Sequence, residues 1–431
     1  MTTRLPRALT PLRNRSYALL LAGQLSSNVG DMLYAVALPW YVLATHGGAL
    51  LLATVLAAYG IPRTVLIAVG GHASDRFKPW TVMMGADAVR AAAAAALGIA
   101  AASGRADAAV LIAIAITLGA GEGMFLPASY SIIPSLVGGG LQAANALSSA
   151  NTQLATLLGP AVGGVLVATL GPSPAFGIDA ATFVISALTL ARIRAARHPA
   201  AAHSTDAVDD PGDRDDRTAP APSLLRFVRS QPLMQLVLVV NVAGNLGSGA
   251  VSEVALPALA HGPFQAGASG YGAMIAAFGA GALAGTLTAG QARQFMRPAV
   301  IASIAFLLDA LAQALVPYLG GVERAAVALA ALGALNGFAN ILTLTAFQRW
   351  APPALMGRVM GLMMLTSMGV FPVSVMLGGI VVVHLGAAAV FPLASATIVL
   401  AVGFALTQPV WRRFGMARSA RATAVEHPSM T

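Results

Sequence analysis

The sequence predicts an all-α polytopic membrane protein with twelve transmembrane helices, arranged as two pseudo-symmetric six-helix bundles. Hydrophobic residues make up 57% of the 431 residues and charged residues only 10%. Apolar segments of about 20 residues or more recur along the chain, each long enough to cross a hydrocarbon core of about 30 Å. A β-barrel would need strictly alternating strands of about ten residues, and that pattern is absent.

Apolar runs between turn-forming residues define the expected spans. They cover roughly residues 16–45, 49–71, 80–102, 107–132, 141–169 and 173–195, then 231–260, 267–290, 297–319, 323–348, 357–384 and 387–411. The intervening segment is rich in Pro, Asp and Arg and cannot bury an apolar face, so we expect a flexible linker. The predicted organisation is an N-terminal bundle (1–195), a cytoplasmic linker (196–228) and a C-terminal bundle with a cytoplasmic tail (229–431).

Basic residues set the expected orientation. With a cytoplasmic N-terminus, 21 of the 25 Lys and Arg residues fall on the inner side, two fall in outer loops, and two lie inside spans. Cytoplasmic segments of membrane proteins carry such an excess, so both termini and the linker are expected to face the cytoplasm. The formal charge of +9 then reflects topology and contact with anionic headgroups, not nucleic-acid binding. The dominance of arginine indicates a GC-rich bacterial source, hence a bacterial inner membrane.

The two halves repeat each other at offsets of 214 to 219 residues. "LGAGEGMFLP" at 118–127 aligns with "LGALNGFANI" at 332–341, and "VALP" occurs at 36–39 and again at 254–257. Duplicated six-helix halves related by an axis along the membrane normal are the architecture of one large class of transporters.

Several classes of chemistry find no support in the sequence. There is no cysteine for a disulfide or a thiolate metal site, the seven His residues are scattered, and no phosphate-binding Walker motif occurs. We therefore expect no cofactor, no metal and no enzymatic activity.

Three motifs, in order, resemble the major facilitator superfamily over nearly the whole chain. "GHASDRFK" at 71–78 is similar to its signature between the second and third helices, with Gly71, Asp75 and Arg76 in place and Lys78 where Gly is usual. "ATLLGPAVGG" at 155–164 is similar to its antiporter motif, through Gly159, Pro160, Gly163 and Gly164. Residues 14–41 look like the first helix of the drug:proton antiporter branch that contains macrolide-efflux proteins and the enterobactin exporter.

The resemblance implies a role for the short charged loop at 72–79. In this family the loop carboxylate lies at the cytoplasmic face against the eleventh helix, which would begin near Gly357 here. Asp75 would then accept hydrogen bonds from free backbone N–H groups and favour an outward-open state. The alternative is that these charges only enforce topology, and that alternative carries most weight for Lys78.

Ionisable groups inside the membrane are costly, so each needs a reason. Six carboxyl groups and two arginines lie within expected spans: Asp31, Asp87, Glu122, Asp179, Glu253, Asp309, Arg63 and Arg90. Asp87 and Arg90 are three residues apart and are expected to pair on one helical face, with Arg63 at a similar depth. Asp179 and Asp309 lie on helices that pack outside the family's cavity, so packing or hydrogen-bonding roles are favoured for both.

Asp31, Glu122 and Glu253 fall on the first, fourth and seventh helices, which line the central cavity in this family. They are the candidates for proton coupling. Asp31 is the leading one, because it lies mid-span after Gly30 and has no basic partner in its own helix beyond Arg15. The alternatives are that Asp31 only hydrogen-bonds a neighbouring helix and that Glu122 is neutralised by Arg90 or another basic group.

The same helices supply polar and aromatic side chains suited to an amphipathic ligand. These cavity candidates are Gln24, Asn28, Tyr34, Trp40, Phe125, Asn241, Asn245, Asn336 and Asn340. For each one alone, hydrogen bonding between helices is an equal explanation. The small residues of the antiporter-like motif and of Gly281–Gly285 are expected to let the fifth and eighth helices cross closely at the interface between the bundles.

Together these features predict a secondary exporter, a monomer, that moves an amphipathic drug or metabolite outward in exchange for protons. A narrow-substrate exporter, for instance of a siderophore, and a proton-coupled importer are the alternatives within transport. A non-transporting membrane sensor or scaffold is the alternative from another class, and the short linker argues against it.

Overall fold

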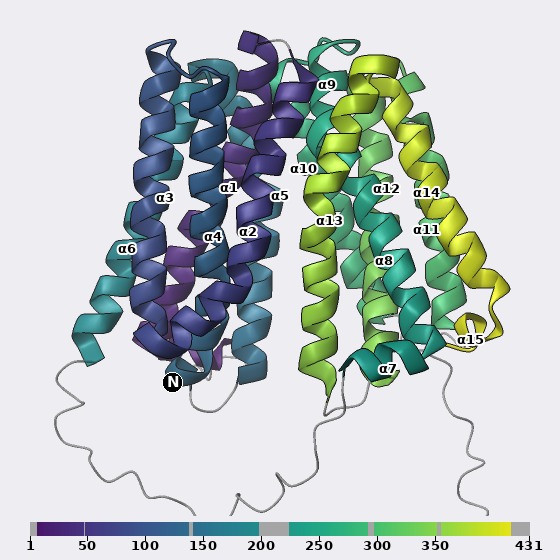
Figure 1. Ribbon diagram of the computed structural model, residues 1–431, viewed down its shortest axis with the longest axis horizontal. Helices are drawn as coiled ribbons and strands as arrows, with labels where there is room; N and C mark the ends of the chain where they lie inside the picture. Colours follow the sequence, from purple (N-terminus) through teal and green to yellow (C-terminus); the bar gives the residue numbers. More distant parts are fainter. Residues whose placement is uncertain are drawn as a thin grey trace, which may run out of the picture.

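The computed structural model is helical throughout its described part, residues 7–46, 48–137, 141–197, 224–291, 297–350 and 355–414. Figure 1 shows two groups of long helices side by side, each running between the same two sides of the molecule. We call the side where α6 ends and α7 begins the linker side, and the opposite side the far side. This confirms the predicted all-α polytopic architecture.

The first half contains a short 3₁₀ helix, η1 (Arg7–Arg13), and six long helices. The long helices are α1 (Arg15–His46), α2 (Ala49–Phe77), α3 (Pro79–Ala102), α4 (Ala108–Val137), α5 (Leu141–Leu170) and α6 (Pro172–Arg197). Each agrees with its expected span to within a few residues, except that α2 and α4 extend further toward the linker side.

The second half begins with the short helix α7 (Leu224–Ser230) and again contains six spans. They are α8 (Pro232–Ala250) continued by the π-helical segment η3 (Val251–Ala255) and α9 (Leu256–His261), then α10 (Gly267–Gln291), α11 (Pro298–Leu315) with the 3₁₀ turn η4 (Val316–Tyr318), α12 (Val322–Trp350), α13 (Met356–Leu385) and α14 (Ala387–Thr407). The last expected span ends at Thr407, earlier than predicted, and a separate short helix, α15 (Pro409–Arg412), follows it.

Eleven of the described spans are long and apolar enough to cross a membrane. The one expected span that is not among these eleven is the first, α1. It is 32 residues long, but Gln24, Asn28 and Asp31 make its middle polar. It packs lengthwise against α5 and α6, inside the same bundle as the other five. A polar stripe in the middle of a span that lies among other helices points to a water-filled or ligand-filled interior.

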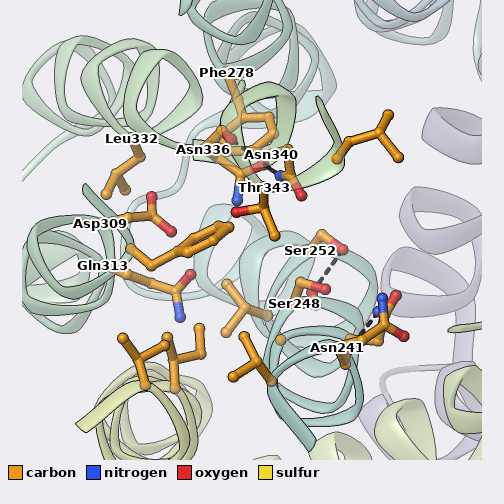
Figure 2. A pocket seen from close by; sticks show the side chains of 18 of the residues that line it. Asn241, Ser248, Ser252, Phe278, Asp309, Gln313, Leu332, Asn336, Asn340 and Thr343 are labelled. Atoms are coloured by element: carbon orange, nitrogen blue, oxygen red, sulfur yellow. Dashed lines mark hydrogen bonds between the residues drawn. The ribbon is translucent and has the colours of Figure 1, made fainter. Parts of the chain in front are cut away.

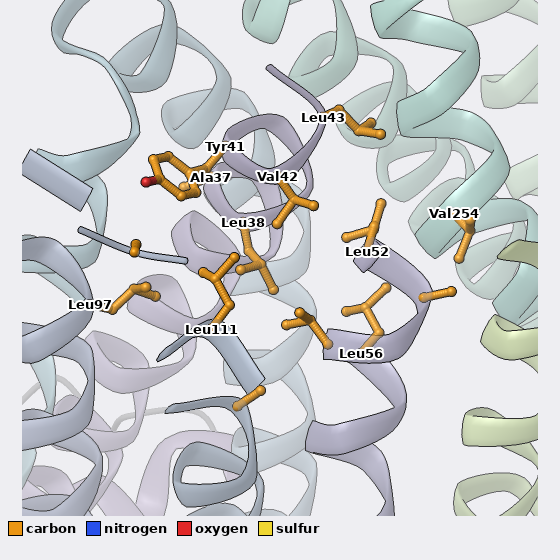
Figure 3. Packing of buried hydrophobic residues seen from close by; sticks show 14 of the residues in the cluster. Ala37, Leu38, Tyr41, Val42, Leu43, Leu52, Leu56, Leu97, Leu111 and Val254 are labelled. Atoms are coloured by element: carbon orange, nitrogen blue, oxygen red, sulfur yellow. The ribbon is translucent and has the colours of Figure 1, made fainter. Parts of the chain in front are cut away.

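Apolar packing distinguishes the two sides of the molecule. On the far side, one buried cluster combines Leu38 and Leu52 of the first bundle with Val254 of the second, as Figure 3 shows. A second far-side cluster brings Val36 of α1 into the core of the second half. The clusters near the linker side, around Tyr17 and around Met234, each draw their described residues from one bundle. The two bundles are therefore sealed together by apolar contacts on the far side.

The predicted loop at 72–79 is almost entirely helical, which corrects that expectation. α2 continues through Asp75 and Arg76 to Phe77, and α3 begins at Pro79. The single residue between them, Lys78, has φ 65° and ψ 131°. This conformation is easy for Gly and strained for Lys, which explains why the family signature carries Gly at this position. Proline is well suited to the first turn that follows.

Replacing Lys78 by glycine is therefore expected to stabilise the protein. Relief of the strained backbone outweighs the extra conformational freedom of glycine in the unfolded chain, for a net gain of about 1 kcal/mol. Thermal unfolding of the purified protein in detergent measures this. Gly85→Ala is the comparison variant. Gly85 has no positive φ, and a Cβ there would meet nothing within 4 Å, so this substitution changes a glycine without changing backbone strain. A lower melting temperature for Lys78→Gly would show that the Lys78 contact with the Trp80 ring, 5.6 Å from the ring centroid, matters more than strain.

Candidate functional site

The two bundles enclose a cavity of about 430 Å³ at their interface. The first bundle lines it with polar residues from all six of its long helices, and the second contributes Glu253 together with Met364, Met368 and Phe371. A hydrogen bond from Thr64 to the carbonyl of Met368, 3.0 Å long, crosses between the bundles beside it. A smaller cavity of about 260 Å³ adjoins this one within the first bundle and shares Asn28, Asp31, Arg90 and Glu122 with it.

Asp31 lies on the wall of this cavity and forms an ion pair with Arg90. Nη2 of Arg90 donates to Oδ1 of Asp31 at 2.6 Å, and the side chain of Arg90 is 4% exposed. The expectation that Asp31 lacks a counter-charge is therefore wrong, because the partner comes from α3 and not from its own helix. Arg90 also lies over the ring of Phe183, 4.0 Å from the centroid, so an aromatic face holds the guanidinium in place.

The predicted pair within α3 is the weaker contact of Arg90. Nη1 of Arg90 is 3.9 Å from Oδ1 of Asp87, at the limit of an ion pair. Asp87 is fully buried, and both of its carboxyl oxygens lack a hydrogen-bond partner in the described structure. Arg90 thus lies between two carboxyl groups and contacts only one of them closely.

Glu122 is held by groups from α2. Arg63 Nη2 lies 3.0 Å from its Oε1, and the Tyr59 hydroxyl donates to its Oε2. This agrees with the alternative in which another basic group neutralises Glu122. Arg63 also lines the interface cavity together with Asp31 and Glu253. A single guanidinium therefore faces carboxyl groups from both bundles.

Glu253 reaches the cavity from the π-helical segment η3. The two "VALP" repeats align Glu253 with Ala35, one helical turn beyond Asp31, and all three residues line the interface cavity. Single π-helical turns are rare and occur often at functional sites. In η3, two neighbouring residues line different cavities. Glu253 lines the interface cavity, whereas Ser252 lines a separate cavity inside the second bundle.

Asp179 lies at the interface cavity as well, contrary to the expectation that its helix packs outside. It is 1% exposed, its Oδ1 lacks a hydrogen-bond partner among the described residues, and it shares the cavity with Asp31. Gly30 makes this possible, because a Cβ there would lie 2.6 Å from Oδ1 of Asp179. The close approach that Gly30 permits is thus that of α6.

The interface cluster therefore contains five carboxyl groups, Asp31, Asp87, Glu122, Asp179 and Glu253, and two guanidinium groups, Arg63 and Arg90. Ionised carboxylates without counter-charges are costly in a membrane interior. Two arginines can neutralise two carboxylates, and the remainder are suited to carrying exchangeable protons.

The predicted substrate residues divide between cavities. Gln24, Asn28 and Phe125 line the smaller cavity of the first bundle, and Asn28 and Tyr34 line the interface cavity. Asn241, Asn245, Asn336 and Asn340 line a cavity of about 580 Å³ inside the second bundle. Trp40 lies elsewhere: its ring packs edge-on against His261 of α9, 5.2 Å between centroids, at the far side.

The antiporter-like motif in α5 contacts two different helices. Gly159 and Gly163 face α1 within the first bundle, next to Met32 and Leu33, whereas Gly164 meets Gly272 of α10 across the interface. A Cβ on Gly164 would lie 2.9 Å from Cα of Gly272. The expected crossing of the fifth and eighth spans is present, but Gly281 and Gly285 do not form it. They pack against the backbone of α12 at Ala330 and Ala334.

Gly164→Leu is therefore expected to give a folded protein that cannot bring the bundles together on the far side. The added side chain has no space where two backbones meet, and backbone cannot yield as a flexible side chain does. Substrate flux through proteoliposomes should be lost or become an uncoupled leak. Gly177→Leu in α6, where a Cβ meets nothing within 4 Å, is the matched control and should keep its flux. Normal coupled flux in Gly164→Leu would show that the close contact between Gly164 and Gly272 is not required for transport.

In the gating motif, the structure describes Gly71 and Arg76 but not the side chain of Asp75. Gly71 has open space around it, and the guanidinium of Arg76 lies 5.5 Å from the centroid of the Phe77 ring. The side chains of residues 356–358, where α13 begins, are likewise outside the described part. The cap of that helix by Asp75 therefore stays a prediction.

Two six-helix bundles around a cavity with membrane-embedded charges are the architecture of one large class of secondary transporters. The chain belongs to the major facilitator family described as transmembrane secretion effector, whose sequence pattern matches residues 7–420.

Comparison with curated relatives and solved structures supports this assignment. Enterobactin exporter EntS of Shigella boydii serotype 18 is 30% identical over 233 residues, covering 53% of this chain and 52% of that protein. EntS of Citrobacter koseri is 29% identical over 230 residues. The chain spans about half the length of these relatives. A POT family transporter in complex with 5-aminolevulinic acid has a TM-score of 0.68 at 11% identity, covering 91% of this chain and 96% of that one, and nucleoside transporter NupG has a TM-score of 0.64 at 13% identity. These two likenesses concern the fold.

Proposed function

We propose that the protein exports an amphipathic small molecule across a bacterial inner membrane in exchange for protons. The observation that carries the proposal is the interface cluster, in which carboxyl groups from both bundles outnumber the arginines that neutralise them. Protonation there changes the charge at the place where the two bundles meet, so it can bias one arrangement of the bundles over another. The family description and the exporters among the relatives support outward transport.

The geometry supports an inward-facing state in this proposal. The positive-inside rule puts the linker side in the cytoplasm, and the bundles are sealed by apolar packing on the far side. Substrate would enter the interface cavity from the cytoplasm. Loading of protons from the far side would follow once the bundles have rocked to the other arrangement.

In this scheme, protonation of Asp31 changes the position of the Arg90 side chain. With Asp31 ionised, Arg90 pairs with it at 2.6 Å and leaves Asp87 at 3.9 Å. A proton on Asp31 removes the charge that holds Arg90, which can then move toward the unpaired carboxyl of Asp87. The exchange alters the wall of the cavity that α1 and α3 share.

Expression in a host that lacks its own drug pumps tests the exporter and its breadth. Raised resistance to several unrelated toxic compounds is the expected result. The alternative is export of a siderophore, which the names of the relatives favour. In that case resistance stays unchanged, and a host without its own siderophore exporter regains secretion under iron limitation. No flux of either kind would support the sensor or scaffold.

Asp75→Asn tests the proposed gate at the linker side. The amide cannot complement the positive end of a helix dipole as a carboxylate does, so the closed arrangement of the linker side loses about 0.3–1 kcal/mol. Expression is expected to stay normal while the maximal transport rate falls. Arg76→Gln is the companion variant for charge at the same turn. Unchanged transport kinetics in Asp75→Asn would reduce the motif to a topology signal.

A further inference from the structure

The second bundle encloses a cavity of its own, separate from the interface cluster. It measures about 580 Å³, within the range of small-molecule sites, and lies between α8, α10, α11, α12 and α14. Its walls carry a high share of aromatic and aliphatic groups, including Phe278, Phe306 and Phe347. Figure 2 shows Asp309 and Gln313 of α11 lying near Asn336 and Thr343 of α12 around the same space.

Among the described residues, Asp309 gives this cavity its single carboxyl group, and no basic side chain accompanies it. Asp309 is 5% exposed, and Asn336 is its polar neighbour. Within the part of the chain that the structure describes, none of the residues that line the cavity is Lys, Arg or His. A buried carboxylate is stabilised by a cation or by donated hydrogen bonds, and here the walls offer only neutral amides and hydroxyls.

Two further polar atoms at this cavity are buried and unsatisfied. Nε2 of Gln313 and Oγ1 of Thr343 lack hydrogen-bond partners in the described structure. Native proteins leave few such atoms unpaired, and those at a cavity are explained by a ligand that supplies the partner. The amide of Gln313 requires an acceptor, whereas the carboxyl group of Asp309 has the neutral side chain of Asn336 as its hydrogen-bond partner and lacks a cation among the described residues.

We propose that this cavity binds an organic ammonium ion that has an apolar body and at least one acceptor oxygen. The ammonium group pairs with Asp309, the acceptor oxygen receives the hydrogen bond of Gln313 Nε2, and the aromatic walls hold the apolar body. The proposal names a substrate class and a subsite for the proposed export function and in that sense rests on it. The π-helical segment connects the two sites, since Ser252 lines this cavity while Glu253, its neighbour, lines the interface.

Binding of two fluorescent probes to the purified protein, with no gradient present, tests the proposal. Dansylcadaverine carries an ammonium group and sulfonyl oxygens, and N-butyl dansylamide has the same fluorophore without the charge. The wild-type protein is expected to bind the ammonium probe about tenfold or more tightly, the size of one hydrogen bond to a charged group. Asp309→Asn should erase that preference, and Asp309→Glu should retain part of it.

Two further variants accompany these: one controls for folding and for loss of a carboxylate elsewhere, and the other tests the hydrogen bond of Gln313. Asp107→Asn removes an exposed carboxylate at the start of α4 and should leave the preference intact, because Asn keeps the capping bond to the Val110 N–H. Gln313→Leu should weaken both probes equally, since both carry the acceptor oxygens. If Asp309→Asn does not fold, the comparison of the two probes on the wild-type protein and on Asp309→Glu still decides.

Equal binding of the two probes by the wild-type protein, binding of neither, or a preference that survives in Asp309→Asn would each overturn the proposal. These outcomes are separable from failure of the export function. A preference for the ammonium probe without proton-driven flux would support the proposed site and contradict the proposed export function. Export without this preference would support the export function and contradict the proposed site.

Discussion

Asp31→Asn is expected to abolish proton-driven accumulation of substrate while exchange down a substrate gradient persists. Asparagine keeps the size of the side chain and can still contact Arg90, but it cannot release or bind a proton. The interface cavity therefore loses the switch that links protonation to the position of Arg90. Proteoliposomes with an imposed pH difference measure the first activity, and counterflow without a pH difference measures the second.

Asp107→Asn, which removes a carboxylate outside the spans, is the matched control and should transport as the wild type does. Accumulation against a gradient by Asp31→Asn would show that Asp31 is not the coupling group. Glu253 and Glu122 would then be the next candidates, since both line the same cavity.

Arg90→Leu is expected to have the second large effect, and on folding as well as on transport. The side chain is buried, pairs with Asp31 and lies against Phe183, so its removal leaves a carboxylate without a partner. Loss of one member of a buried ion pair costs about 3–5 kcal/mol, a large fraction of the stability of most proteins. The amount of folded protein after extraction and its melting temperature measure the loss.

Arg90→Lys separates charge from shape at this position. Lysine restores a cation but not the planar guanidinium that stacks on the ring and forks toward two carboxyl groups. It should recover part of the stability and little of the coupling. Full stability of Arg90→Leu would mean that Asp31 is neutral or solvated in the resting protein, and the proposed switch would fail.

Much of the fold could be predicted from the sequence because the bilayer sets the length of each span. The halves could be aligned through "VALP", which matches Glu253 to Ala35, one helical turn from Asp31, and the structure places both carboxyl groups on one cavity. Lys78 is a further case: the departure from the usual Gly was visible in the sequence, and the structure shows its consequence in a positive φ.

The partners of the charged groups could not be predicted in the same way. Spacing within one helix reveals only neighbours three or four residues apart, so it favoured Asp87 as the partner of Arg90. The shorter contact, to Asp31, depends on how α1 and α3 are rotated against each other. Gly121 also contributes, because a Cβ there would lie 2.5 Å from Cγ of Arg90, a constraint that only the packed structure reveals.

Rotation of helices about their axes explains the other differences. Spans that are apolar on every side give no signal for which face lines a cavity, so the sequence does not reveal that Asp179 lies on the interface cavity or that Asp309 lies on a cavity inside the second bundle. Small residues permit close packing against any neighbour, so Gly281 and Gly285 could not be assigned to α12 instead of α5. The π-helical turn at 251–255 shifts the register within one span, and periodicity alone does not reveal it.

The central claim is that substrate leaves the cell in exchange for protons through the carboxyl cluster at the bundle interface. The most direct measurement uses wild-type protein in proteoliposomes that contain a pH-sensitive dye, with an imposed substrate gradient and no initial pH difference. Substrate movement is expected to drive protons in the opposite direction, and Asp31→Asn is expected to move substrate without moving protons. Substrate movement by the wild-type protein with no proton movement would contradict it.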